Sequence, residues 1–103
     1  MALKKEPRIT LSGIKMLQAF LNSKGYRACG ADIMRATGLL PGTTYPLLSR
    51  FKEAGWLTSE WEQLDPSEAG RPPRLYYQLT GQGQKAAIAN LSSLSFSLLG
   101  AET

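Results

Sequence analysis

The feature that most constrains this chain is a four-residue turn between two short stretches of helical pattern. Residues 39–42, Leu-Leu-Pro-Gly, combine apolar side chains that can pack onto a core with the proline and glycine that reset the direction of a chain. Gly38 ends the segment before the turn, 30–37, and Gly55 ends the segment after it, 42–54. The sequence therefore predicts two helices joined by a tight turn that packs onto the core.

Apolar spacing gives these helices a buried face and predicts another helix ahead of them. That first helix runs from about Thr10 or Ser12 to Ser23, and its apolar stripe is formed by Leu11, Ile14, Leu17 and Leu21. In the segment 42–54, the core positions at i, i+3, i+4 and i+7 are Thr44, Leu47, Leu48 and Phe51. Pro46 is expected in the first helical turn, where it lacks only an N–H that has no intrahelical partner.

The second half of the chain begins with β-prone patterning. Residues 56–62 and 75–80 are expected as two strands of a β-wing, and the loop between them contains Pro66, Gly70, Pro72 and Pro73. Thr80 can then cap a final helix, from about 81 to 99. A short dimerisation seam is predicted on this helix, at spacings of four, three and four, by Ala87, Leu91, Leu94 and Leu98.

The order of these elements predicts an α+β fold that is mostly α. It is a winged helix-turn-helix of three helices and a two-stranded β-wing, followed by a C-terminal dimerisation helix. We expect a flexible basic arm at 1–9, the winged helix-turn-helix DNA-binding domain at 10–80 and the dimerisation helix at 81–100. The length of 103 residues fits one domain with a modest core.

The composition argues against most catalytic and metal chemistry. The chain has no histidine and a single cysteine, Cys29, so His-based catalysis, the usual zinc sites and an internal disulfide cannot be built. No carboxylate pair, nucleophile-base pair or phosphate-cradling glycine loop occurs at a usable spacing. We therefore expect no enzyme, no metal and no cofactor. Without a signal-peptide pattern or a membrane-spanning apolar run, the expected location is the cytoplasm, with no membrane partner.

Positive charge is concentrated in the first half of the chain. Residues 1–59 hold nine basic and three acidic side chains, and the whole chain has a net charge of +4 and a pI near 9.5, which favours a polyanionic partner. The outward side of helix 42–54 offers hydroxyl and guanidinium donors suited to phosphates and base edges. The predicted DNA contacts on this helix are Thr43, Thr44, Tyr45, Pro46, Ser49 and Arg50.

Two blocks of the sequence resemble the PadR-like family of transcriptional regulators. The first comprises 40–48 (Leu-Pro-Gly-Thr-Thr-Tyr-Pro-Leu-Leu) and, after it, Arg50-Phe51, Glu53 and Gly55-Trp56-Leu57. The second is 70–80 (Gly-Arg-Pro-Pro-Arg-Leu-Tyr-Tyr-Gln-Leu-Thr), followed by Gly83. The resemblance covers about residues 10–98. It implies a winged-helix dimer that represses transcription, with DNA contacts from Thr43, Tyr45 and Arg50 and, on the wing, from Arg71 and Arg74.

The sequence departs from this family at two places. Thr44 stands where a larger apolar residue is usual, and Arg27-Ala28-Cys29 replaces a frequent aromatic segment ahead of the second helix. The short C-terminal part resembles members that dimerise through one helix. For ligand-responsive members the resemblance suggests a small hydrophobic effector at the dimer interface, and the residues that could contact it are Trp61 and Phe96.

The wing arginines also admit a local interpretation. Glu60, Glu62, Asp65 and Glu68 lie near Arg71 and Arg74 in sequence, so ion pairs within the loop are an alternative to DNA contacts. We expect this acidic run to point away from DNA into solvent, because it would otherwise repel phosphate.

The favoured interpretation is a homodimeric, sequence-specific repressor of a pseudo-palindromic double-stranded DNA operator. Two alternatives remain. One is a ligand-responsive sensor of a flat aromatic compound at the dimer interface, and the other is a winged-helix adaptor that binds proteins instead of DNA.

Overall fold

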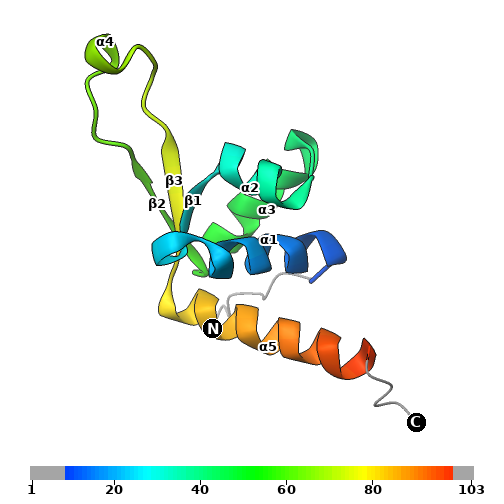
Figure 1. Ribbon diagram of the computed structural model, residues 1–103. Coiled ribbons are helices and arrows are strands. Elements are labelled where there is room, and N and C mark those ends of the chain that lie inside the picture. Colours follow the sequence, from blue (N-terminus) through cyan, green and yellow to red (C-terminus); the bar gives the residue numbers. More distant parts are fainter. Residues whose placement is uncertain (1–8, 99–103) are drawn as a thin grey trace.

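The computed structural model describes the backbone of residues 9–98 and the side chains of residues 9–93. Figure 1 shows a helical body from which a long β-hairpin projects. In chain order the elements are α1 (Leu11–Asn22), the 3-10 turn η1 (Lys24–Tyr26), β1 (Arg27–Cys29), α2 (Gly30–Thr37), α3 (Pro41–Glu53), β2 (Leu57–Trp61), α4 (Pro66–Ala69), β3 (Leu75–Leu79) and α5 (Gly81–Leu98).

The ends of the first helices follow the expected signals. The Thr10 hydroxyl accepts the Gly13 N–H at 3.1 Å and so caps α1. Gly38 ends α2 with a φ of 77°, a left-handed conformation in which its N–H reaches the Met34 carbonyl at 2.8 Å. Pro41 is the first residue of α3, a position where its missing N–H costs nothing. The predicted helix-turn-helix is confirmed.

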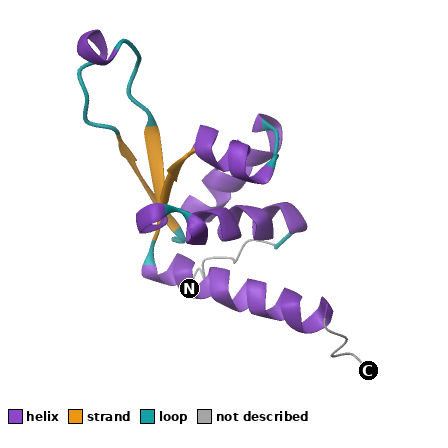
Figure 2. Ribbon diagram, viewed as in Figure 1, coloured by secondary structure: helices purple, strands orange, loops and turns teal. Residues whose placement is uncertain are grey.

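The strands form one three-stranded antiparallel sheet in the order β1-β3-β2. The expected two-stranded wing is therefore incomplete, because β1 pairs with the other edge of β3 and places Arg27 opposite Gln78. A strand of three residues carries no alternation that could have revealed it. The wing loop also holds the one-turn helix α4, which Figure 2 shows at the far end of the hairpin.

The core lies where α1, α2 and α3 meet the inner face of the sheet. Phe51 of α3 and Trp56 stack with ring centroids 5.1 Å apart, and both are at most 2% exposed. Burying a side chain of this size contributes roughly 1.5 to 3 kcal/mol. The fully buried residues of α1 are Met16, Leu17 and Phe20. Leu11, expected in that stripe, is instead 62% exposed, because α1 begins beyond the edge of the core.

Helix α5 is anchored at its start to the rest of the fold. The Thr80 hydroxyl accepts the Gly83 N–H at 3.0 Å and donates to the Gly55 carbonyl at 2.7 Å, which confirms Thr80 as the cap. Gly83 lies directly against the Trp56 carbonyl, where a Cβ would collide. From this anchor α5 runs antiparallel to α1 along its outer side (Figure 1).

Candidate nucleic-acid interface

Helix α3 divides cleanly into a buried side and an exposed side. Thr43, Tyr45, Pro46, Ser49 and Arg50 are all exposed, as expected for the outward face. Leu47, Leu48 and Phe51 are buried in the core, so the orientation of the exposed side is fixed by packing. The helix can therefore present its donors to a partner without rearranging.

Thr44 does not belong to the exposed face. Its side chain is fully buried, and its hydroxyl donates to the Leu40 carbonyl at 2.9 Å. Counting it among the DNA contacts is wrong, because four residues separate it from Leu48 and both lie on the core side of α3.

Pro46 lies deeper in α3 than expected. Since the helix begins at Pro41, Pro46 is in its second turn, where an N–H would normally bond to the carbonyl of Gly42. Gly42 is exposed, so water can satisfy that carbonyl. The proline is tolerated for this reason and not because it occupies the first turn.

The start of α1 borders the exposed face of α3. A hollow of about 320 Å³ between the two helices is lined by Thr10, Ser12, Gly42, Thr43, Pro46, Leu47 and Arg50. Thr10 and Ser12 add hydroxyl groups to the face that carries Arg50. The sequence marks Thr10 as a helix cap, but its position beside α3 is set by tertiary packing and is not visible in any spacing.

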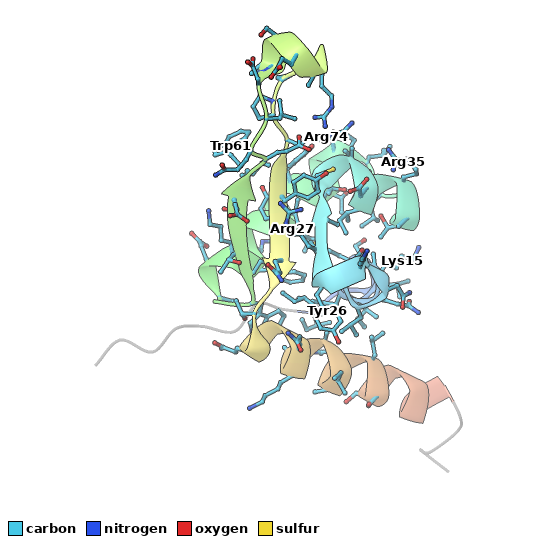
Figure 3. The ribbon with its side chains drawn as sticks, turned by 60° about the vertical axis from the view of Figure 1, so that its left-hand side comes forward. Lys15, Tyr26, Arg27, Arg35, Trp61 and Arg74 are labelled. Carbon is cyan, nitrogen blue, oxygen red and sulfur yellow. The ribbon has the colours of Figure 1, made fainter. Side chains whose placement is uncertain are left out.

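Among the described side chains, the wing (residues 57–79) carries one arginine that is paired with a carboxylate, Arg71, and one that is not, Arg74. Arg71 binds the Glu62 carboxylate through Nη1 at 2.7 Å and Nη2 at 3.0 Å. This is the local ion pair considered above as an alternative to DNA contact. The expectation that Glu62 points away into solvent is wrong, because Arg71 holds its carboxylate. Arg74 is exposed, and the ion pairs among the described side chains, Arg71 with Glu62 and Arg35 with Asp32, do not involve it. Figure 3 shows Arg74 between the wing and the helices that precede it.

The sequence matches the model of the PadR-like family of transcriptional regulators over residues 12–89. This match spans α1, the exposed face of α3, the whole wing and the first half of α5. The chain belongs to the PadR-like family. It is accordingly a DNA-binding transcriptional regulator and not an enzyme.

Solved structures of PadR regulators share this fold. A PadR family transcriptional regulator from Eggerthella lenta DSM 2243 has 22% identity and a TM-score of 0.67, over 89% of this chain and 78% of that one. A PadR-like transcription factor from Bacteroides fragilis has 28% identity and a TM-score of 0.66, over 89% of this chain and 86% of that one. The comparison with curated proteins gives no match.

On its outer face the sheet of this PadR-like chain holds a cation–π pair that the sequence pattern does not reveal and that lies apart from α3. The guanidinium of Arg27 lies 4.0 Å above the centre of the Tyr76 ring. These residues come from β1 and β3, and their pairing becomes visible only once β1 is recognised as a strand.

Trp61 is 63% exposed and lies on the wing in Figure 3, away from α5. The other residue suggested as an effector contact, Phe96, lies outside the described side chains. Because α5 and the wing are at different ends of the domain, the structure does not bring Trp61 to a site on α5.

The expected dimerisation seam on α5 needs one correction. Ala87 is fully buried in the core of its own chain, so it cannot contact a partner. Leu91 is half-buried, and the side chains of Leu94 and Leu98 lie outside the described residues. Ile88, next to Ala87, is 58% exposed.

Among the described helices, none is long and apolar enough to cross a membrane.

Proposed function

We propose that this PadR-like regulator is a homodimeric repressor of a pseudo-palindromic double-stranded DNA operator. In this arrangement α3 enters the major groove and the wing contacts the flanking backbone. The observation that carries the proposal is the exposed side of α3, where Thr43, Tyr45, Ser49 and Arg50 project from a helix whose other side is locked in the core.

The chemistry of these side chains fits a division of roles. Arg50 can hold the O6 and N7 acceptors of a guanine bidentately, which distinguishes one base pair from another. Thr43 and Ser49 can donate hydroxyl hydrogen bonds to phosphates and fix the register of the helix. Pro46 offers an apolar surface to a thymine methyl group. Arg74, on the wing, supplies a charge for the backbone.

A dimer is supported by apolar side chains that the single chain leaves exposed. Ile88 on α5 is 58% exposed and Leu11 at the start of α1 is 62% exposed. Because the two helices are antiparallel, the first turn of α1 lies beside the later turns of α5 (Figure 1). A second copy that packs its own α5 against this side of the helix would cover Ile88. A dimer that binds adjacent half-sites must hold its two α3 helices about one turn of DNA apart, roughly 34 Å.

Fluorescence anisotropy with labelled fragments from the region upstream of the protein's own gene tests the proposal. We expect tight binding to one fragment, weaker binding to a random duplex and a steep loss of affinity with rising salt. Transcription in vitro from the bound fragment should fall as the regulator is added. Equal affinity for the fragments and the random duplex would contradict sequence-specific binding, and a rise in transcription would contradict repression.

A further inference from the structure

A hollow between α3 and the wing gathers hydrogen-bond donors from separate elements. Its volume is about 210 Å³, and its lining residues are Cys29, Gly30, Ala31, Tyr45, Arg74, Leu75 and Tyr77. Two tyrosines and one arginine therefore border the same small space. None of the side chains in this lining is a carboxylate, so the hollow has donors suited to an anion and no charged group that would repel one.

Tyr45 is held at this hollow by the absence of a side chain at Gly30. A Cβ on Gly30 would lie 2.7 Å from the Tyr45 hydroxyl oxygen and 2.9 Å from Cε1. The phenol therefore rests directly against the first residue of α2. Any larger residue at Gly30 would displace the Tyr45 ring from the hollow.

Tyr77 reaches the same hollow from the sheet. It lies opposite Ala28 on β1 and Ser59 on β2, on the face of β3 that packs toward the helices. Burial raises the pKa of the Tyr77 phenol, and the nearby Tyr45 raises that pKa further. The Tyr77 hydroxyl is protonated at neutral pH, as an ordinary phenol is, and can donate a hydrogen bond.

Two carboxylates that accept backbone N–H groups of lining residues, Asp32 from Cys29 and Glu62 from Arg74, are already paired with arginines. Asp32 accepts Arg35 Nη1 at 3.1 Å and the Cys29 N–H at 3.3 Å. Glu62 is bound by Arg71 at 2.7 Å. With both carboxylates neutralised in this way, the Arg74 guanidinium gives the hollow a positive charge.

We propose that this hollow is a phosphate-binding site that seats one backbone phosphate of bound DNA. The hydroxyls of Tyr45 and Tyr77 and the guanidinium of Arg74 donate to the phosphate oxygens, which can only accept. The site lies between the helix that reads the groove and the wing, where one DNA strand passes from one to the other. The inference rests on the proposed DNA binding, and it adds Tyr77 and Gly30 to the residues that fix the register.

The test combines one protein variant with one altered phosphate. Tyr77→Phe removes a single hydroxyl, and Tyr76→Phe is a matched control because Tyr76 lies on the opposite face of β3, under Arg27. We expect operator affinity to fall about ten-fold for Tyr77→Phe, as for the loss of one hydrogen bond to a charged group, and to stay unchanged for Tyr76→Phe. Thermal melting of both variants checks that they fold alike.

Operators with a neutral methylphosphonate at each position in turn locate the phosphate. At one position in each half-site, the methylphosphonate should lower the affinity of wild-type protein relative to the unmodified operator. At the same position it should not lower the affinity of Tyr77→Phe any further. If wild-type protein binds the operator and Tyr77→Phe binds equally well, the phosphate site is wrong while the proposed function stands. If wild-type protein shows no preference for the operator over random DNA, the proposed function itself fails.

A free phosphate ion shares this chemistry, so a second titration separates the two sources. Inorganic phosphate is added to the DNA-free protein, with sodium chloride of equal ionic strength as the control, while backbone amide signals of residues 30 and 31 are followed by NMR. Weak binding in the millimolar range or none agrees with a backbone phosphate. Saturable binding at micromolar phosphate, lost in Tyr77→Phe while operator affinity is unchanged, would overturn the assignment to DNA.

Discussion

Arg71 holds both oxygens of the Glu62 carboxylate, with Nη1 to Oε1 at 2.7 Å and Nη2 to Oε2 at 3.0 Å. The same Oε1 accepts the backbone N–H of Arg74 at 3.2 Å, and the Glu62 N–H donates to the Arg74 carbonyl at 2.8 Å. Glu62 thus ties together the two sides of the wing loop. Because Arg74 is part of this arrangement, we interpret Arg71 as a residue that positions Arg74.

Glu62→Gln separates this positioning role from direct DNA contact by Arg71. The substitution removes a negative charge and weakens the hold on Arg71. If Arg71 contacts DNA directly, the variant should therefore bind DNA more tightly. If Arg71 positions Arg74, affinity should instead fall about three-fold. Anisotropy titrations at fixed salt measure the change. Tighter binding by Glu62→Gln would contradict the positioning role.

The Glu62 carboxyl should titrate far below its ordinary range. Hydrogen bonds from the Arg71 side chain, then from the Arg74 backbone, lower the pKa of Glu62 from 4.5 to about 2. Because the folded pKa is the lower one, the pair stabilises the folded chain above pH 4.5, and this contribution is lost as the pH falls from 4.5 through about 2. NMR titration of the carboxyl carbon should show the low midpoint in wild type and a higher midpoint in Arg71→Gln, which stays below 4.5 because the Arg74 N–H still donates to Glu62. A wild-type midpoint near 4.5 would show that the pair does not form in solution.

The fold could be predicted largely from local signals. Three residues mark helix ends through backbone conformation or capping: Gly38, Pro41 and Thr80. Such effects depend on neighbouring residues alone. Strand β1 was missed because three residues leave no periodicity, and its partner β3 lies almost fifty residues later. Pairing at that separation is decided by how the helices place the two segments, which the local pattern does not contain.

Arg50→Ala and Arg74→Ala should weaken DNA binding in different ways. Loss of a bidentate guanine contact by Arg50→Ala should cost roughly 1 to 3 kcal/mol and relax the preference for operator over random DNA. Arg74→Ala should weaken binding to every sequence and lower the slope of affinity against salt by about one ion. Titrations of each variant against both duplexes at several salt concentrations measure these effects. Equal losses on operator and random DNA from both variants would contradict the division of roles.

Adjacent threonines on α3 should differ in their effect on binding. Thr44 is fully buried and its hydroxyl is bound to the Leu40 carbonyl at 2.9 Å, so Thr44→Val should leave DNA affinity unchanged and alter the free energy of unfolding by about 1 kcal/mol or less. Thr43 is exposed, and Thr43→Val should lower affinity several-fold while stability stays constant. Chemical denaturation and anisotropy together distinguish the two. Reduced affinity in a stably folded Thr44→Val would restore Thr44 to the contact face.

The candidate site was less predictable than the fold, and the reason is physical. The exposed face of α3 follows from helical periodicity, which is why Tyr45 and Arg50 were found. The state of a wing arginine depends instead on which carboxylate the loop brings to it. Arg71 and Arg74 are three residues apart, yet only the Arg71 side chain forms an ion pair with Glu62. The position of Tyr77 beside Tyr45 likewise depends on the glycine at residue 30.

Ile88→Glu should separate the copies of the proposed dimer without unfolding either. Ile88 is 58% exposed in the single chain, so a carboxylate there is solvated in the monomer. In the dimer it would be buried twice, once per copy, and each lost isoleucine would also forfeit about 1.5 to 3 kcal/mol of apolar burial. Gln82→Glu is the matched control. Gln82 is exposed on another side of α5, and the substitution adds the same negative charge as Ile88→Glu.

Sedimentation equilibrium should find dimeric wild type and Gln82→Glu and a mainly monomeric Ile88→Glu at micromolar concentration. Each monomer keeps its α3, so the affinity of Ile88→Glu for an isolated half-site should equal that of wild type. Its affinity for the complete operator should fall to nearly the half-site value, because two linked α3 helices bind the second half-site at high effective concentration and separate ones do not. A dimeric Ile88→Glu would place the interface elsewhere than on this side of α5. A monomeric variant with undiminished affinity for the complete operator would show that dimerisation does not drive operator binding.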